Sequence, residues 1–516
     1  MSQNQQPAGA DSPADARVDH APGDSPTVSA GAAATLVAVL MVAVFAFQLN
    51  ASMLSPALAT MEKELDATAA QIGLTQTAFF TAAALFSLFL PRWADLIGRR
   101  KVLVGMMAVM FLGCVVAALA PNVTVLFLAR VIQGVAGPTV PMALIMLRVQ
   151  VPNEKQYAFL MAIITSVNGG IAGVDALAGG WLASNFGFRS LFWVMAVIAG
   201  LAVVAVRVAT VESTAIETPK MDWAGVLPAV IALAALLTAF NEAGKLGDAN
   251  WLIVIVLLVV GAGAAVAFWN VEKKVTHPLV PVEYLRQRRT WALLTTTLLT
   301  MTGVFAVMNG LIPNLGQDAN VGAGLDADTV SWVTLTPYAL AGLVFGPVAG
   351  ALAGKFGYRA ILQVGLIGSV LGLGVGVWVV GHTSPWTLLF VSVFVGVTYA
   401  GISNIMLNGL GIVLSPADNP GYLPGMNAAA FNLGAGLSFA VLFAVLTALS
   451  DTGADGATTA TAAGYSGGGG DTHRRDLPRC GVCDVLFYPA ARAAQRQRRA
   501  GTRGLRRHGQ ARPLFF

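Results

Sequence analysis

The sequence has little charge for its length. Only 11% of its 516 residues are Asp, Glu, Lys or Arg, whereas soluble domains carry about 25%, and 56% are hydrophobic, with a mean hydropathy of +0.70. A soluble surface needs charged side chains, so a large soluble core does not explain this composition. Apolar blocks of about 20 residues recur instead, and each can cross roughly 30 Å of hydrocarbon as a helix. The composition therefore predicts an all-α polytopic membrane protein.

Patterns that bind phosphate or metal are also scarce. No G-x-x-x-x-G-K-[ST] loop occurs, so direct use of ATP is not expected. No catalytic constellation occurs either, and we expect neither an enzyme nor a cofactor. Of three cysteines, Cys114 lies in an apolar segment, while Cys480 and Cys483 form a C-x-x-C pair without the second pair of a zinc site. We therefore predict no metal.

Apolar segments of spanning length number thirteen. They cover residues 33–58, 71–91, 102–120, 122–147, 157–184, 188–210, 222–240, 250–270, 290–313, 328–353, 360–381, 385–414 and 422–449. Alternate loops carry fifteen Lys and Arg, against only Lys63, Arg189 and Lys245 in the others. Positive residues mark cytoplasmic loops, so we predict a cytoplasmic N-terminus. The net charge of +5 reflects these loops and implies no nucleic-acid partner.

The segments divide the chain into five regions. Residues 1–31 lack the apolar core of a signal peptide and are predicted to be a disordered cytosolic tail. We predict a six-helix bundle over residues 32–210, a linker with two extra transmembrane helices over 211–289, and a second bundle with five recognisable helices over 290–450. Residues 451–516 form a Gly-rich and then Arg-rich tail.

The tail has a different composition from the rest of the chain. Residues 471–516 contain eleven Arg, no Lys and no apolar block long enough to span. We hypothesise that a reading-frame shift has replaced an expected fourteenth helix. The alternative is a genuine basic tail that lies in the cytosol or on the membrane surface.

Two loops share a sequence pattern. "PRWADLIGRR" covers residues 91–100 and "GALAGKFGYR" covers 350–359, each between the second and third helices of a bundle. Glycine permits a tight turn, and arginine can reach helix carbonyls or a partner carboxylate. Such duplicated halves around a central site are a transporter architecture. The candidate gating residues are Asp95, Gly98, Arg99, Arg100, Gly350, Lys355, Gly357 and Arg359.

These loops, together with "LARVIQGVAGP" (128–138) and "NLGAGLSFAV" (432–441), resemble the major facilitator superfamily. The similarity is strongest to its 14-helix drug:H+ antiporter branch and covers residues 33–450. The resemblance implies two bundles that rock around a central site, and it places the family's buried arginine at Arg130. It also implies proton-driven efflux of drugs, hence antibiotic resistance, by a protein that we expect to be a monomer.

The chain departs from this branch at two places. The branch usually has an acid early in the first helix, within L-D-x-T, where "LNAS" here supplies Asn50. Its antiporter element in the fifth helix, G-P-x-x-G-G, is replaced here by "DALAGG", so Asp175 stands where the first glycine is expected. The expected acid is thus missing at one position, and an unexpected acid occurs at another.

Asp175 is the only charge between residues 157 and 184. An ionised group near the bilayer centre costs about 2.5–3.5 kcal/mol on insertion scales, so it is expected to face the bundle interior or a cavity. Helical spacing places Asn168 on the same face. Asp175 can bind a transported proton or the substrate, with Arg130 as a relay partner, or the two can form a structural pair. Asn50 and Asn309 are either interhelical hydrogen-bonding residues or substrate ligands.

We expect a proton-coupled secondary transporter of the bacterial inner membrane that exports amphipathic drugs or related organic compounds by alternating access. The membrane potential would supply roughly 2.3 kcal/mol per charge per 100 mV. The expected partners are a small organic substrate, protons and the lipid bilayer. The alternatives are a specific exporter or importer of a metabolite, an inactive product that lacks the last helix, and a membrane sensor.

Overall fold

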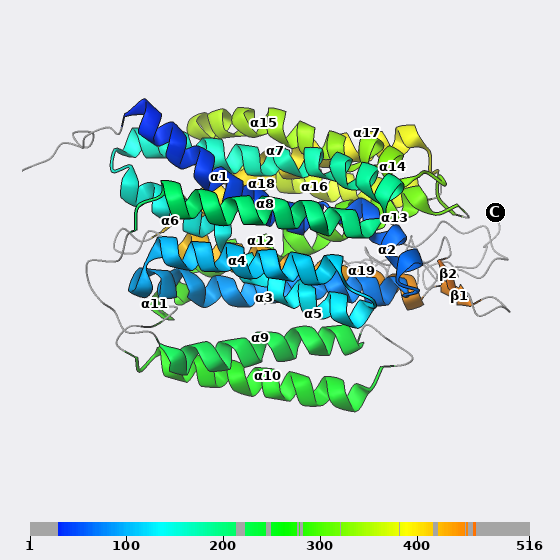
Figure 1. Cartoon of the computed structure of the whole chain (residues 1–516), viewed down its shortest axis with the longest axis horizontal. Coiled ribbons are helices and arrows are strands. Elements are labelled where there is room, and N and C mark those ends of the chain that lie inside the picture. Colours follow the sequence, from blue (N-terminus) through cyan, green and yellow to red (C-terminus); the bar gives the residue numbers. More distant parts are fainter. Residues whose placement is uncertain are drawn as a thin grey trace, which may run out of the picture.

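Long helices run side by side along one direction of the molecule (Figure 1). The computed structural model describes residues 29–212, 222–243, 249–275, 278, 282–319, 321–380, 382–415, 422–448, 450–452 and 458–460. The predicted N-terminal tail, up to residue 28, and most of the predicted C-terminal tail lie outside these ranges. So do the C-x-x-C pair and the position of the expected fourteenth helix.

Thirteen helical segments have the length of a membrane span. Twelve of them are also apolar enough among the described residues, and the other is the 33-residue α7, some of whose side chains are not described. The first half contains α1 (Ala30–Ser52), η1 (Ser55–Ala57), α2 (Leu58–Glu64), α3 (Ala69–Ile97), α4 (Arg99–Ala118), α5 (Val123–Gln133), η2 (Gly134–Ala136), α6 (Thr139–Gln150), α7 (Glu154–Phe186) and α8 (Phe188–Ala209). The prediction of an all-helical transmembrane bundle is confirmed.

The second half follows a helical pair. The pair is α9 (Trp223–Ala243) and α10 (Trp251–Glu272). The second half contains α11 (Val282–Arg286), α12 (Arg288–Phe305), η4 (Ala306–Leu311), α13 (Ile312–Gln317), α14 (Ala327–Val333), α15 (Leu335–Phe356), α16 (Tyr358–Val379), α17 (Pro385–Val395), η5 (Gly396–Ser403), α18 (Asn404–Val413) and α19 (Tyr422–Ala448). The segments η4 and η5 are π-helical turns inside otherwise continuous helices.

The structure differs from the prediction at helix ends and beyond the last helix. Helix α3 runs to Ile97, past the predicted end at residue 91. The first span bends after Ser52 and continues through η1 and α2 to Glu64, beyond the predicted end at residue 58. Beyond α19, β1 (Ser450–Thr452) and β2 (Thr458–Ala460) form an antiparallel pair at one end of the bundle (Figure 1). Open strand edges are not tolerated in hydrocarbon, which is consistent with a pair that follows the last helix rather than interrupting the bundle.

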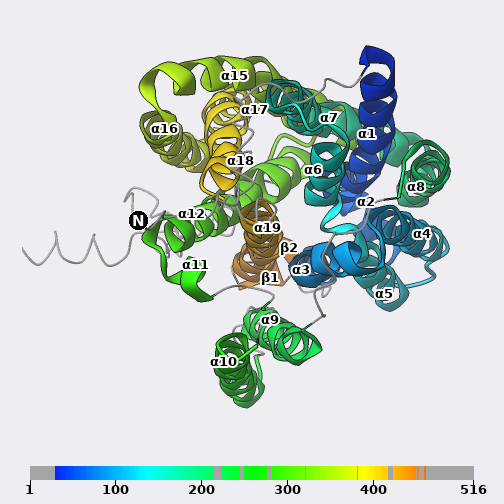
Figure 2. The same cartoon turned by 90° about the vertical axis from the view of Figure 1, so that its left-hand side faces the viewer.

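The two halves lie side by side when viewed along the helices (Figure 2). They meet where α3 packs against α19 and where α7 packs against α14 and α15. Four aromatic rings, Phe79, Phe80, Phe305 and Phe439, stack edge to face or in parallel across this seam. The apolar core is therefore continuous between the halves.

The pair α9–α10 lies outside the main bundle (Figure 2). Helix α9 contacts α3 and α19, whereas α10 packs mainly on α9. Most of α10 faces outwards, with Leu252 and Val259 about 70% exposed. Such an apolar surface is suited to lipid. One side chain of α10, Phe268, packs against a small buried cluster of the second half that includes Leu293 and Tyr422.

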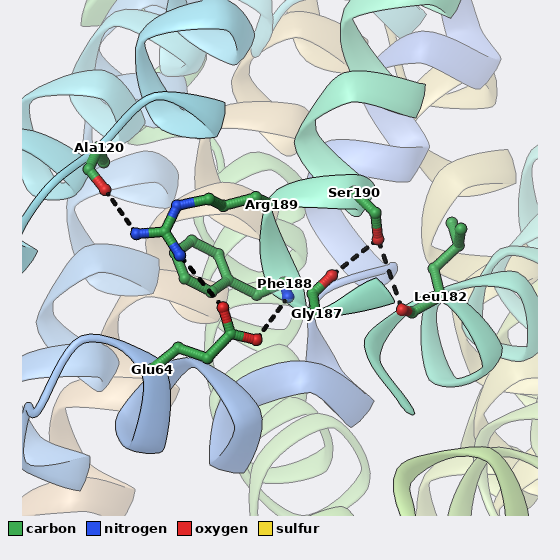
Figure 3. A network of polar contacts seen from close by, with 7 residues as sticks. All are labelled: Glu64, Ala120, Leu182, Gly187, Phe188, Arg189 and Ser190. Atoms are coloured by element: carbon green, nitrogen blue, oxygen red, sulfur yellow. Dashed lines mark hydrogen bonds and ion pairs between the residues drawn. The ribbon is translucent and has the colours of Figure 1, made fainter. Parts of the chain in front are cut away.

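A polar network fastens one end of the first half (Figure 3). The Glu64 carboxylate accepts hydrogen bonds from the Phe188 backbone N–H and from Arg189 Nη1, both at 3.1 Å. Arg189 Nη2 also donates to the Ala120 carbonyl at 3.1 Å. Because Gly187 (φ 74°) joins α7 directly to α8, Glu64 satisfies a free N–H at the start of α8. The network ties α2, the α4–α5 loop and α8 together.

Candidate functional site

A cavity of about 270 Å³ lies between the two halves. It is lined by Phe47, Gln48, Gly137, Val140, Pro141, Leu144, Met161, Gly350, Tyr358, Asn404, Ile405, Met406, Asn408, Gly409, Ile412, Pro424, Asn427, Ala428, Phe431 and Asn432. Gln48 lies in the middle of the first span, whereas Tyr358 starts α16 at the end of the bundle. The cavity thus reaches from the centre towards the end that carries Gly357, which is the predicted cytoplasmic end.

A second cavity, of about 90 Å³, continues towards the interior. It shares Gln48, Asn404, Ile405 and Phe431 with the first cavity. Its other lining residues are Ser52, Met301, Phe305, Asn309, Tyr338, Gly342, Leu343, Gly346, Tyr399 and Ala400. Because η4 and η5 supply Asn309 and Tyr399, π-helical turns shape this part of the site.

None of the described residues that line either cavity carries a charge. Polar character comes chiefly from amides, namely Gln48, Asn309, Asn404, Asn408, Asn427 and Asn432. An amide offers both donors and an acceptor. Aromatic and aliphatic side chains surround these amides. The site therefore suits an uncharged, flat or amphipathic molecule that both donates and accepts hydrogen bonds.

Neighbouring side chains orient three of these amides. Thr297 Oγ1 donates to Asn427 Oδ1 at 2.7 Å, so the Asn427 NH₂ group remains as a donor. Asn408 Nδ2 donates to Asn404 Oδ1 at 3.0 Å, which leaves the Asn404 NH₂ group as a donor. Amides fixed in this way present a defined pattern to a ligand.

Asp175 does not line either cavity, but it contacts Ser52, which lines the second one. Its side chain is 2% exposed, and Oδ2 accepts a hydrogen bond from Ser52 Oγ at 2.5 Å. Oδ1 is buried without a hydrogen-bond partner among the described residues. Ser52 itself lines the second cavity and receives a hydrogen bond from Gln48 Nε2 at 3.0 Å. The carboxylate therefore communicates with the cavity through Ser52.

Arg130 is completely buried, and the ion pairs between described residues do not include one with Asp175. Its guanidinium donates to Gln133 Oε1 at 2.7 Å, Gln76 Oε1 at 2.9 Å and the backbone carbonyl of Asn50 at 3.1 Å. The guanidinium carbon also lies 4.1 Å from the centre of the Phe79 ring. The structural pair that the sequence left open is not formed in this conformation.

The predicted asparagines occupy three different settings. Asn50 packs inside the first half, where Nδ2 donates to the Ala46 carbonyl at 3.0 Å and Oδ1 accepts from the Cys114 thiol at 3.6 Å. Asn309 lines the second cavity and accepts from Ser55 Oγ at 3.3 Å. Asn168 lies in α7, but its side chain is outside the described residues. Only Asn309 is therefore placed in the cavity wall.

The first of the two repeated loops is fastened to the end of α8. Gly98 has φ 114° and joins α3 to α4, and Asp95 pairs with Arg99 at 2.7 Å. The backbone N–H of Arg100 donates to Glu212 at 3.0 Å, and its side chain reaches the Thr210 carbonyl at 3.3 Å. The expected contacts of arginine with a helix carbonyl and a carboxylate are present.

The second loop has the same turn but fewer contacts. Gly357 has φ 84° and joins α15 to α16. Lys355 and Arg359 are exposed, and neither forms an ion pair with a described residue. Gly350 lies about two turns before Gly357, in α15, where it lines the first cavity. The two copies thus share a backbone shape but not a network.

Sequence reasoning missed most of the cavity residues. Gln48, Asn404, Asn408 and Asn427 received no role, although each is an amide inside an apolar helix. That rarity is the available signal, because buried amides need partners or a ligand. Ser52 gave a weaker signal, since serine is common in helices that pack closely.

Comparison with known proteins identifies the family. The family model "Major Facilitator Superfamily" matches residues 40–439. The chain is 62% identical over 423 residues to the uridine/deoxyuridine transporter of Lactococcus lactis subsp. cremoris (strain MG1363), covering 81% of this chain and 88% of the relative. It is 26% identical to the multidrug resistance protein Stp of Mycobacterium tuberculosis (strain CDC 1551 / Oshkosh), over 71% and 67% of the two chains.

Solved structures share the fold at low sequence identity. The nucleoside transporter NupG aligns with a TM-score of 0.55 and 12% identity, over 81% of this chain and 92% of that chain. A D-xylose-proton symporter aligns with a TM-score of 0.54 and 13% identity, over 80% and 90%. The match of the family model over most of the chain agrees with the two-halved helical bundle. The chain belongs to the Major Facilitator Superfamily and is a multi-pass membrane transporter.

Proposed function

We propose that this protein carries uridine and deoxyuridine across the membrane, in the direction of uptake. The observation that carries the proposal is the 62% identity to a uridine/deoxyuridine transporter over 88% of that protein. The site is consistent with it, because an uncharged cavity lined with amides suits a neutral nucleoside. Uracil offers carbonyl acceptors and one N–H donor, which amides can match.

This proposal replaces drug efflux, the leading interpretation of the sequence. The multidrug relative is only 26% identical, and the family resemblance alone does not separate the two functions. A specific metabolite carrier, which the sequence left as an alternative, has the stronger support. Antibiotic resistance and the antiporter label have no comparable support.

Proton coupling belongs to the same proposal. Asp175 is the one carboxylate with a direct hydrogen bond to a described residue of the cavity wall, Ser52. A carboxylate in this position can take up a proton on one side of the membrane and release it on the other. Uptake of uridine together with a proton would use the inward proton gradient. We further propose a bacterial inner membrane, as the bacterial relative suggests, and a cytoplasmic N-terminus, as the charge distribution of the loops predicts.

Uptake of radiolabelled uridine tests the proposal. The chain is expressed in bacterial cells that lack their own nucleoside carriers, and uptake is compared with cells that carry an empty vector. We expect saturable uptake that unlabelled deoxyuridine inhibits and a protonophore abolishes. Absence of uptake, with the protein shown to be in the membrane, would contradict the nucleoside assignment. Lower accumulation of fluorescent dyes in the same cells would favour efflux instead.

A further inference from the structure

The geometry points to Gln48 as the residue that accepts a hydrogen bond from the base of the transported nucleoside, with Ser52 as a positioning residue that links Gln48 to Asp175. The inference rests on the proposed function and assigns a contact within that site. It concerns three side chains from two helices, α1 and α7, and it gives Asp175 a role that needs no direct contact with the ligand.

Gln48 occupies the junction of the two cavities. It lines both of them, together with Asn404, Ile405 and Phe431. A ligand that moves between the wide and the narrow cavity must pass this position. Phe431 and Ile405 supply apolar surface beside the amide, so a flat base can pack there while its edge faces the amide.

The direction of the hydrogen bonds follows from the carboxylate. While Asp175 is ionised, its carboxylate accepts hydrogen bonds only, so Ser52 donates its single proton to Asp175 Oδ2. The lone pairs of Ser52 Oγ then remain for Gln48 Nε2, which donates to them at 3.0 Å. The Gln48 amide is thereby fixed with its nitrogen towards Ser52. Its carbonyl oxygen, Oε1, is left as the acceptor available to the cavity.

The hydroxyl of Ser52 has a second acceptor in reach. The backbone carbonyl of Gln48 lies 3.1 Å from Ser52 Oγ. A Ser52 that no longer donates to Asp175 can turn its proton to this carbonyl, and the fixed chain of donors is then broken. Arg130, the other buried charge nearby, does not take part in the hydrogen bonds between Asp175, Ser52 and Gln48. Its guanidinium donates instead to Gln76, Gln133 and the Asn50 carbonyl. The protonation state of Asp175 thus affects the orientation of Gln48 through one group, the Ser52 hydroxyl.

An acceptor at this place suits the N3–H group of uracil. Of the polar edge atoms of uracil, N3–H is the one donor between two carbonyl acceptors. Asn404, whose Oδ1 is occupied by Asn408, presents its NH₂ donor to the same junction and can serve a neighbouring carbonyl. A nucleoside methylated at N3 cannot donate to Gln48 and leaves the amide oxygen without a partner. Losing such a contact typically costs tenfold or more in binding.

Competition against radiolabelled uridine uptake tests the inference. The probes are unlabelled uridine and 3-methyluridine, and the measured quantity is the ratio of their inhibition constants. For the wild type we expect 3-methyluridine to be at least ~10-fold weaker. In Ser52→Ala the amide loses its anchor, so the ratio should fall to within about threefold of unity while uptake of uridine persists with a raised KM. Ser52→Thr keeps the hydroxyl and should restore the ratio.

A matched control removes a buried hydroxyl elsewhere. Ser438→Ala deletes an equally buried serine that donates only within α19, at 2.6 Å to the Ala435 carbonyl, and it should leave the ratio unchanged. If Ser52→Ala takes up uridine and keeps the wild-type ratio, the inference is wrong although the proposed function stands. If the wild type takes up no uridine at all, the proposed function itself fails.

Discussion

Arg130 and Asp175 are both buried charges in apolar helices of the same half, yet their surroundings differ. Arg130 is enclosed by three hydrogen-bond acceptors and the face of Phe79. Among the described residues, the Asp175 carboxylate has one side-chain hydrogen-bond partner, Ser52, and its Oδ1 has none. A charged group whose donors all have fixed acceptors stays in one protonation state. A carboxylate with a single partner can gain or lose a proton with little rearrangement of its surroundings.

This difference predicts a structural role for Arg130 and a role in transport for Asp175. We expect Arg130 to hold α1, α3 and α5 together, because its acceptors lie on all three. We expect Asp175 to contribute little to stability and much to coupled transport. Each of the following changes tests one side of that contrast.

The largest effect is expected from Arg130→Met. The substitution leaves Gln133 Oε1, Gln76 Oε1 and the Asn50 carbonyl without their donor in a site that water does not reach. Each unsatisfied group costs roughly 1–3 kcal/mol, so we expect a loss of about 3 kcal/mol or more in unfolding free energy. Thermal unfolding of the purified protein in detergent measures it. A variant that melts like the wild type but does not transport would make Arg130 a functional residue.

A smaller loss of stability is expected from Gln133→Leu. The guanidinium loses the acceptor of its Nη1 group but keeps Gln76 and the Asn50 carbonyl, so the cost should be about 1–2 kcal/mol. Gln133 lines neither cavity, and the KM for uridine should therefore not change. A changed KM with unchanged melting would reverse the interpretation of this network.

Part of this contrast could be predicted from the sequence and part could not. Charge scarcity and the spacing of apolar blocks are enough to predict the helical bundle, and the pattern G-x-R is enough to place the turns at Gly98 and Gly357. The partners of Arg130 and Asp175 could not be predicted. They depend on how far each helix is rotated and how closely α1 approaches α7, and an apolar sequence constrains neither.

The same limit explains the missed cavity amides. Asn50 and Asn404 look alike in sequence. Each lies in an apolar segment with a second amide a few residues away, Gln48 or Asn408. Asn50 faces Met110 and Cys114 inside the first half, whereas Asn404 faces the cavity. Only the packing of the helices distinguishes them.

Asp175→Asn should uncouple transport without unfolding the protein. The amide keeps the shape of the side chain but binds no exchangeable proton, so uphill accumulation of uridine should fall at least ~10-fold. Exchange of internal for external uridine, which needs no net proton movement, should persist, and melting should be unchanged or higher. Asp222→Asn is the control, because Asp222 is a buried carboxylate that caps α9 and lies outside both cavities. Accumulation that survives in Asp175→Asn would remove Asp175 from the coupling site.

The smallest effect is expected at Asp326, a carboxylate with an ordinary structural role. It caps α14, and its hydrogen bonds with Thr329 hold its pKa below the usual value. Because the pKa is lower in the folded state, the ionised carboxylate stabilises the folded protein at pH values above the unfolded pKa of about 4. This stabilisation is lost as the pH falls through the folded pKa. Asp326→Ala should therefore cost about 0.5 kcal/mol near pH 7 and less at pH 3, as judged by thermal unfolding. Asp326→Asn keeps the cap and should lose only the dependence on pH.

The π-helical turns η4 and η5 have a consequence for how this chain is compared with its relatives. A π-turn holds one residue more than an α-helical turn, and each residue of an α-helix adds about 100° of rotation. Deletion of a single residue from η5 would leave an unbroken helix but turn α17 and α18 by that angle relative to each other. Asn309 and Tyr399 therefore owe their direction to a surplus residue. An alignment that opens no single-residue gap at these turns would pair the cavity wall of one transporter with the lipid face of another.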